Sequence, residues 1–161
     1  MKTEKLKEAL ALYTTSYPNK SSYVFLDERI TPELLSKHKK RYAQLAPTEE
    51  ALLVVNNNIL GSIAAYGWSG ILISEHYLYY RCLKDSFFSS LVALPSTGKI
   101  PLSAIDTLVI GAHDTCFGTA YIGHKLVVNG KSVGLLRMGG AMQFDDNTIA
   151  SLNYIFQQAQ S

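Results

Sequence analysis

The chain has 161 residues, of which 47% are hydrophobic and 17% charged, and its formal net charge is +2. This length suffices for one domain with its own hydrophobic core, and the composition argues against disorder. The small net charge gives no reason to expect a nucleic-acid partner. The first ten residues, MKTEKLKEAL, lack the apolar centre of a secretory signal, and no apolar run approaches the roughly 18 residues of a transmembrane helix. We therefore expect a cytoplasmic protein without a transmembrane segment.

The first 49 residues predict two amphipathic helices. Thr3 is placed to cap the first helix, in which Leu6, Leu10 and Tyr13 recur at spacings of four and three. The apolar run at residues 23–26, which follows a loop-like stretch, fits either a short strand or a buried linker.

The second helix has a clear predicted start, because a threonine hydroxyl can accept an unpaired backbone N–H and proline is tolerated at the first helical position. Thr31 and Pro32 supply these two features. Pro47 bounds the helix on the other side, and its apolar side is predicted to consist of Leu34, Leu35, His38, Tyr42 and Leu45.

After Glu49 and Glu50 the apolar period changes from helical to extended for nearly a hundred residues. The central feature is a hairpin over residues 67–83, in which two apolar, β-branched and aromatic runs flank the polar residues Ser74, Glu75 and His76. This pattern predicts two strands joined by a three-residue turn.

Further strands are predicted on both sides of this hairpin. Residues 51–55 and 59–65 flank three asparagines, and 91–94, 105–111 and 118–122 are further candidates. A turn is predicted at residues 95–98 and an edge-type segment at 100–102. Asn129 and Gly130 separate the runs 126–128 and 133–136, and this dipeptide is the strongest short hairpin signal, because both turn residues need positive φ.

The chain closes with a third amphipathic helix, capped by Asp145, Asp146 or Asn147, whose apolar residues are Ile149, Leu152, Phe156 and Ala159. We expect an α+β, mainly β, fold with about seven antiparallel strands, two N-terminal helices and a C-terminal helix that covers the open end of the sheet. Residues 1–49 would form a helical leader packed on a domain of residues 50–161.

Three segments, GILISEHYLYYR, KIPLSAIDTLVIG and HKLVVNGKSVGLL, followed by a helix, resemble the bacterial pleckstrin-homology-like (PH-like) family over roughly residues 50–158. The resemblance implies a barrel of seven strands and one helix that binds lipid headgroups, peptides or other proteins, and it brings no catalytic signature. Lipid-binding relatives carry a basic cluster where this chain has Asn56, Asn57 and Asn58, which argues against phosphoinositide binding at that loop.

The basic run from Lys37 to Arg41 is a candidate surface for an anionic membrane, nucleic acid or an acidic partner, with Lys37, Lys40 and Arg41 as its binding residues. The simpler interpretation is a solvated helix face, because on a helix these residues spread around the axis. Cys82 and Cys116 form neither a CxxC motif nor a zinc pattern, so no metal or cofactor is expected, and a disulfide between them stays open.

Two further groups of residues are candidate sites. His113, Asp114 and Cys116 would serve a thiol hydrolase only if they faced one another, which their spacing does not require. Trp68, Tyr77 and Tyr79 offer an aromatic interaction surface, although cross-strand packing is the simpler explanation for the tyrosines.

From these patterns we expect a non-enzymatic module for protein binding or self-association. The alternatives are an anionic-ligand or peripheral membrane binder that works through the basic helix, and the thiol hydrolase.

Overall fold

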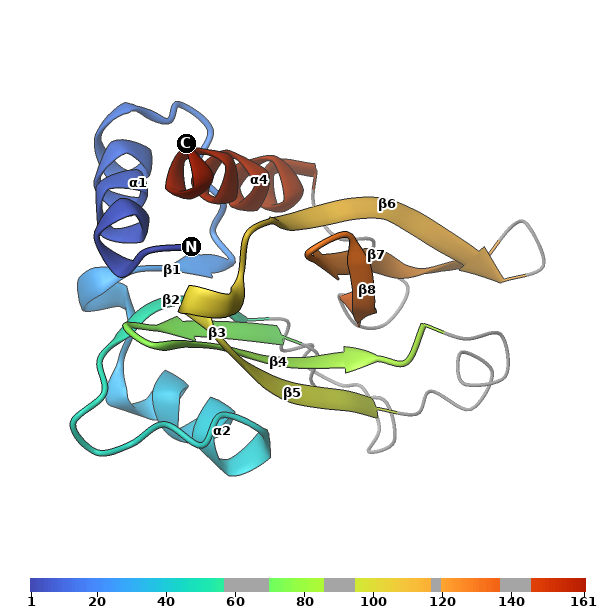
Figure 1. Ribbon diagram of the computed structural model, residues 1–161, viewed down its shortest axis with the longest axis horizontal. Helices are drawn as coiled ribbons and strands as arrows, with labels where there is room; N and C mark the ends of the chain where they lie inside the picture. Colours follow the sequence, from blue (N-terminus) through green and yellow to red (C-terminus); the bar gives the residue numbers. More distant parts are fainter. Residues whose placement is uncertain (57–69, 86–94, 117–119, 137–145) are drawn as a thin grey trace.

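The computed structural model describes residues 1–56, 70–85, 95–116, 120–136 and 146–161. It is an α+β fold in which one curled antiparallel sheet carries helices on both faces (Figure 1). None of the helices in these ranges is both long enough and apolar enough to cross a bilayer.

Helices α1 (Thr3–Ser16) and α4 (Asp146–Gln160) lie side by side over one face of the sheet (Figure 1). The predicted apolar positions Leu6, Leu10 and Tyr13 of α1 are buried. The predicted cap is wrong, since Lys2 is the N-cap and makes no capping hydrogen bond through its side chain. The Thr3 hydroxyl instead donates to the backbone oxygen of Glu75 at 2.6 Å, which ties the start of α1 to the sheet.

Helix α2 (Pro32–Arg41) covers the opposite face of the sheet (Figure 1). It begins as predicted, with the Leu34 N–H donating to the Thr31 hydroxyl at 3.2 Å. Leu34 is buried against Val54 and Leu72 of the sheet. Between α1 and α2, residues 23–26 contain the short strand β1 (Val24–Phe25), followed by the 3-10 helix η1 (Asp27–Arg29).

The sheet consists of two meanders. The first is β2 (Ala51–Asn56), β3 (Gly70–Ser74), β4 (Tyr77–Leu83) and β5 (Pro95–Pro101), with β1 added beside β2. The 3-10 helix η2 (Leu102–Ala104) leads to the second, β6 (Leu108–Cys116), β7 (Ala120–Val128) and β8 (Lys131–Leu136). Strand β4 joins the meanders, because it pairs with β3 as far as Arg81 and with β8 at Leu83.

The predicted central hairpin is present as β3 and β4, with a turn one residue shorter than expected. Ser74 is the last residue of β3, so the turn consists of Glu75 and His76. The Ser74 hydroxyl accepts hydrogen bonds from the backbone N–H groups of Tyr77, at 3.0 Å, and His76, at 3.3 Å. Serine therefore closes the turn with its side chain, as short polar residues commonly do.

The turn predicted at residues 95–98 is wrong, because these residues form the first half of β5. Proline is tolerated in an edge strand where its nitrogen faces away from the partner. Gly98 lies opposite Tyr80, and a Cβ atom at Gly98 would come within 2.3 Å of the tyrosine hydroxyl. Turn-like composition here reflects an edge position and a close aromatic contact.

The Asn129–Gly130 hairpin is confirmed, with φ values of 50° and 74°. The Asn129 side chain does more than turn the chain. Its Oδ1 accepts from the N–H groups of Asp106, at 2.8 Å, and Thr107, at 3.0 Å, and its Nδ2 donates to the oxygen of Ala104 at 2.8 Å. The β7–β8 turn thereby holds the connection between η2 and β6.

One core runs between the sheet and the α1–α4 pair. It includes the α4 residues Leu152, Phe156 and Ala159, as predicted, and joins them to α1 and to the inner side chains of the strands. Strand β6 begins at Leu108, three residues later than expected, and β7 begins at Ala120. The predicted segments 59–65 and 91–94 lie outside the described residues.

Candidate functional site

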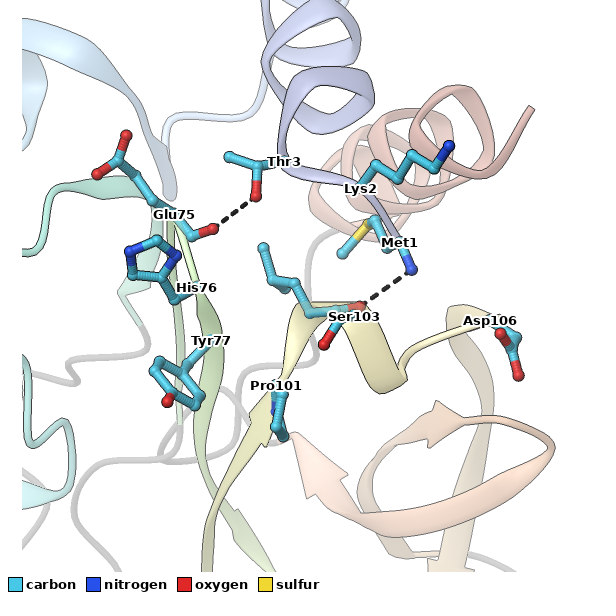
Figure 2. A pocket seen from close by; sticks show the side chains of 10 residues that line it. Met1, Lys2, Thr3, Glu75, His76, Tyr77, Pro101, Ser103 and Asp106 are labelled. Atoms are coloured by element: carbon cyan, nitrogen blue, oxygen red, sulfur yellow. Dashed lines mark hydrogen bonds between the residues drawn. The ribbon is translucent and has the colours of Figure 1, made fainter.

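A cavity of about 690 Å³ lies at the β3–β4 turn (Figure 2). Three segments far apart in the sequence form its walls: the N-terminal end of α1, the β3–β4 turn, and the junction of β5 with η2. Its lining residues are Met1, Lys2, Thr3, Glu75, His76, Tyr77, Pro101, Leu102, Ser103 and Asp106.

Glu75 links two of these walls. Its carboxylate lies 2.9 Å from Nζ of Lys7, and its backbone oxygen accepts from Thr3 (Figure 2). The hydrogen bond from Lys7 lowers the pKa of Glu75, and the same bond raises the pKa of Lys7. The first two turns of α1 are thus held against the β3–β4 turn by one charged and one neutral contact.

The third wall is held by backbone hydrogen bonds. The Leu102 N–H donates to the backbone oxygen of His76 at 2.8 Å, and the Met1 nitrogen donates to the oxygen of Leu102 at 3.0 Å (Figure 2). His76, Ser103 and Asp106 are exposed. The cavity therefore offers an imidazole, a hydroxyl and a carboxylate on a framework whose backbone is already fixed, which suits recognition of a polar ligand.

A partly buried hydrogen-bond network lies behind the turn, on the α2 side. The Glu49 carboxylate accepts from the Tyr79 hydroxyl at 3.0 Å, from the Ser74 hydroxyl, and from the Ala46 N–H at 3.3 Å. Burial and the nearby Glu49 carboxylate raise the pKa of Tyr79. These contacts fix the α2–β2 connection to the β3–β4 hairpin, and nothing in the sequence pattern pointed to Glu49.

The two tyrosines of the predicted aromatic surface differ in exposure. Tyr79 is 1% exposed and packs beneath α2, so it is removed from any surface patch. Tyr77 is half-buried, with its ring 5.9 Å from that of Tyr79, and Nζ of Lys99 lies 3.6 Å from the Tyr77 ring centroid. Trp68 lies outside the described residues.

The basic residues Lys37, Lys40 and Arg41 are exposed on α2 and are not part of the cavity. Lys37 is 2.8 Å from Glu33, one turn earlier. His38 faces the sheet and is buried, as the helical pattern predicted, and its burial lowers its pKa to about 4.

The candidate thiol site is only partly described. His113 is exposed in β6 and pairs with His124 of β7, with ring centroids 5.7 Å apart. The side chains of Asp114 and Cys116 lie outside what the structure describes. Cys82 carries a free, buried thiol, whose pKa is raised by burial. Among the described residues, no cluster of three or more histidine, cysteine or acidic side chains is arranged to hold a metal ion.

Comparisons with protein-family models, with curated proteins and with solved structures found no match to this chain.

Proposed function

We propose that this chain is a non-enzymatic binding or assembly module of the PH-like type, and that its ligand is a segment of another protein. Two meanders, β2–β5 and β6–β8, followed by α4, support the seven strands and one helix that the resemblance implies. The proposal depends mainly on the cavity at the β3–β4 turn, which is lined by three segments far apart in the sequence and whose exposed residues include His76, Ser103 and Asp106.

The cavity has the character of a recognition site for a peptide chain. His76, Ser103 and Asp106 provide hydrogen-bonding groups in its lining, which also includes the half-buried Tyr77, whose ring centroid lies 6.4 Å from that of His76. An aromatic ring beside exposed hydrogen-bonding groups is typical of protein interfaces. Because the walls are already joined by hydrogen bonds, a partner would not have to order them on binding, which favours affinity.

The test is affinity capture with light scattering on the eluted complex. Ser103→Arg would place a long cationic side chain at the cavity wall, and Ser16→Arg, at the exposed last position of α1, is the matched control. We expect the wild-type protein and Ser16→Arg to retain the same partner, or to form the same oligomer, and Ser103→Arg to lose it. A monomer that retains nothing, or a partner retained equally by all three proteins, would contradict the proposal.

A second candidate function rests on α2, where Lys37, Lys39, Lys40 and Arg41 are all exposed. These cations suit a peripheral contact with anionic lipid. Sedimentation with vesicles of phosphatidylserine and phosphatidylcholine, at low and moderate salt, tests it, because such binding weakens as ionic screening rises. The candidate is rejected if no protein sediments at low salt.

A further inference from the structure

The strands at the margins of the sheet differ in whether the backbone groups of their outer edges have hydrogen-bond partners. Strand β1 has only two residues. The edge of β6 is covered by α4, because Asn153 accepts from the Ile110 N–H at 2.8 Å and donates to the Ile110 oxygen at 2.9 Å. Gln160, two turns later on α4, donates to the Leu108 oxygen at 2.9 Å. Side-chain amides thus take the place of a neighbouring strand beside β6.

Strand β5 is different. Its seven residues pair with β4, and within the described part of the chain β5 has no second partner strand. Unpaired backbone N–H and C=O groups along such an edge are a template for an added strand.

The hydrogen-bond pattern shows which groups of β5 point outward. The Leu102 N–H donates to the His76 oxygen, which marks these two residues as a hydrogen-bonded pair. Because such pairs alternate along an antiparallel ladder, Ile100, Gly98 and Ser96 point their backbone groups towards β4. The outward-facing residues are Pro95, Thr97, Lys99 and Pro101, and all four are exposed.

The two prolines lie at outward positions, so neither removes a hydrogen bond from the ladder with β4. Thr97 and Lys99 each present one N–H and one C=O to a neighbour, whereas Pro95 and Pro101 present only their oxygens. The prolines limit the usable edge to a short length, which favours a short added segment over edge-to-edge association of whole sheets.

The side chains beside this edge are cationic. Lys99 and Arg81 lie on the same face of β4 and β5, since Arg81 pairs with Thr97 and Lys99 pairs with Tyr79. No ion pair involves Lys99 or Arg81 among the described residues. Partner residues opposite Thr97 and Lys99 would place their side chains on this same face, where carboxylates would meet the two cations.

We propose that the outer edge of β5 binds an extended acidic segment of a partner protein as an added strand. This inference rests on the proposed function and names the chemistry of its partner. Strand β5 ends at Pro101, which also lines the cavity, so the edge and the cavity are continuous.

The direct test uses a fluorescently labelled heptapeptide with glutamate at alternate positions. Its controls are the same peptide with lysine at those positions and a version with N-methylated backbone amides. We expect the glutamate peptide to bind, with slower amide exchange at Thr97 and Lys99 and no change at Gly98, whose N–H is already bonded to β4. Both control peptides should fail to bind.

Two variants sharpen the test. Thr97→Pro removes one outward N–H and leaves the ladder with β4 intact, and Thr97→Val is its matched control. We expect Thr97→Pro to weaken binding about five- to tenfold and Thr97→Val to leave it unchanged. Lys99→Glu keeps every backbone group and reverses one charge, so it should also weaken binding of the glutamate peptide. If Thr97→Pro fails to fold, the test depends on Lys99→Glu alone.

The inference is overturned if the glutamate peptide does not bind, or if Thr97→Pro and Lys99→Glu both bind it like the wild type. It is also overturned if Thr97 and Lys99 become protected without peptide as protein concentration rises, since a second copy would then occupy the edge. A cellular partner lost by Ser103→Arg but retained by Thr97→Pro and Lys99→Glu would overturn this inference alone and leave the proposed function standing.

Discussion

Acidification should destabilise the fold through His38. This histidine is 1% exposed, and its Nδ1 lies 2.7 Å from the Tyr42 hydroxyl. Burial lowers its pKa from 6.5 to about 4, so between these two pH values His38 is protonated in the unfolded chain and neutral in the folded protein. Stability from His38 is complete above pH 6.5 and declines as the pH falls from 6.5 towards 4. From about pH 7.5 to about pH 4.5 the loss should be about 2.5 kcal/mol of unfolding free energy.

The measurement is urea denaturation at a series of pH values, followed by tyrosine and tryptophan fluorescence. His38→Gln is the matched variant, because glutamine keeps a hydrogen-bonding side chain beside Tyr42 and does not titrate. The lowered pKa values of Glu33 and Glu75 cause a further loss at more acidic pH, and this loss is common to both proteins. Parallel pH profiles for the wild type and His38→Gln would refute the reasoning.

Three other substitutions probe the packing of the fold. Asn153→Ala leaves the Ile110 N–H and C=O without their side-chain partner, so urea denaturation should show a decrease of about 1 to 3 kcal/mol in the free energy of unfolding. Gln157→Ala, at an exposed position of α4, is the control, and an equal effect of the two substitutions would contradict the edge-covering role of Asn153. Asn129→Gly should lose the three side-chain hydrogen bonds but tolerate the positive φ. Asn129→Ala should lower the free energy of unfolding by about 1 kcal/mol more in thermal denaturation, because alanine is strained at positive φ, and equal losses in the two variants would argue against this strain. Phe156→Ala should lower the free energy of unfolding by about 3 to 5 kcal/mol in thermal denaturation, because it leaves a cavity in the core. A much smaller decrease, measured by calorimetry, would show that the core collapses around the removed side chain.

The features predicted correctly from the sequence are those set by neighbours along the chain. Thr31 and Pro32 start α2 through contacts within one helical turn, and Asn129 and Gly130 turn the chain through their own backbone preferences. The apolar period of α4 likewise depends on residues three and four apart. Each of these signals is complete within a few residues.

The features missed from the sequence depend on distant partners. Residues 95–98 have the composition of a turn, and only their pairing with β4 makes them a strand. Thr3 has the composition of a cap, but its hydroxyl bonds a carbonyl 72 residues away. Alternation placed Tyr77 and Tyr79 on one face, and the position of α2 then decides which of them is buried.

The cavity could not be predicted from the sequence because its walls come from three distant segments, the N-terminus, the β3–β4 turn and η2. Of the predicted binding residues that the structure describes, it contains only Tyr77. Lys7 and Ser103 gained a role only once these segments were brought together, and Glu49 only once the α2–β2 connection contacted the β3–β4 hairpin.

The pairing of α1 with α4 also sets the order of events during synthesis. Tyr13 of α1 donates to the Ser151 hydroxyl at 3.0 Å across a separation of 138 residues. At a ribosomal rate of about 5 to 20 residues per second, α1 waits on the order of 10 s for its partner helix to emerge. Throughout that interval its apolar stripe is open to chaperones and proteases, which makes the newborn chain more vulnerable than the finished protein.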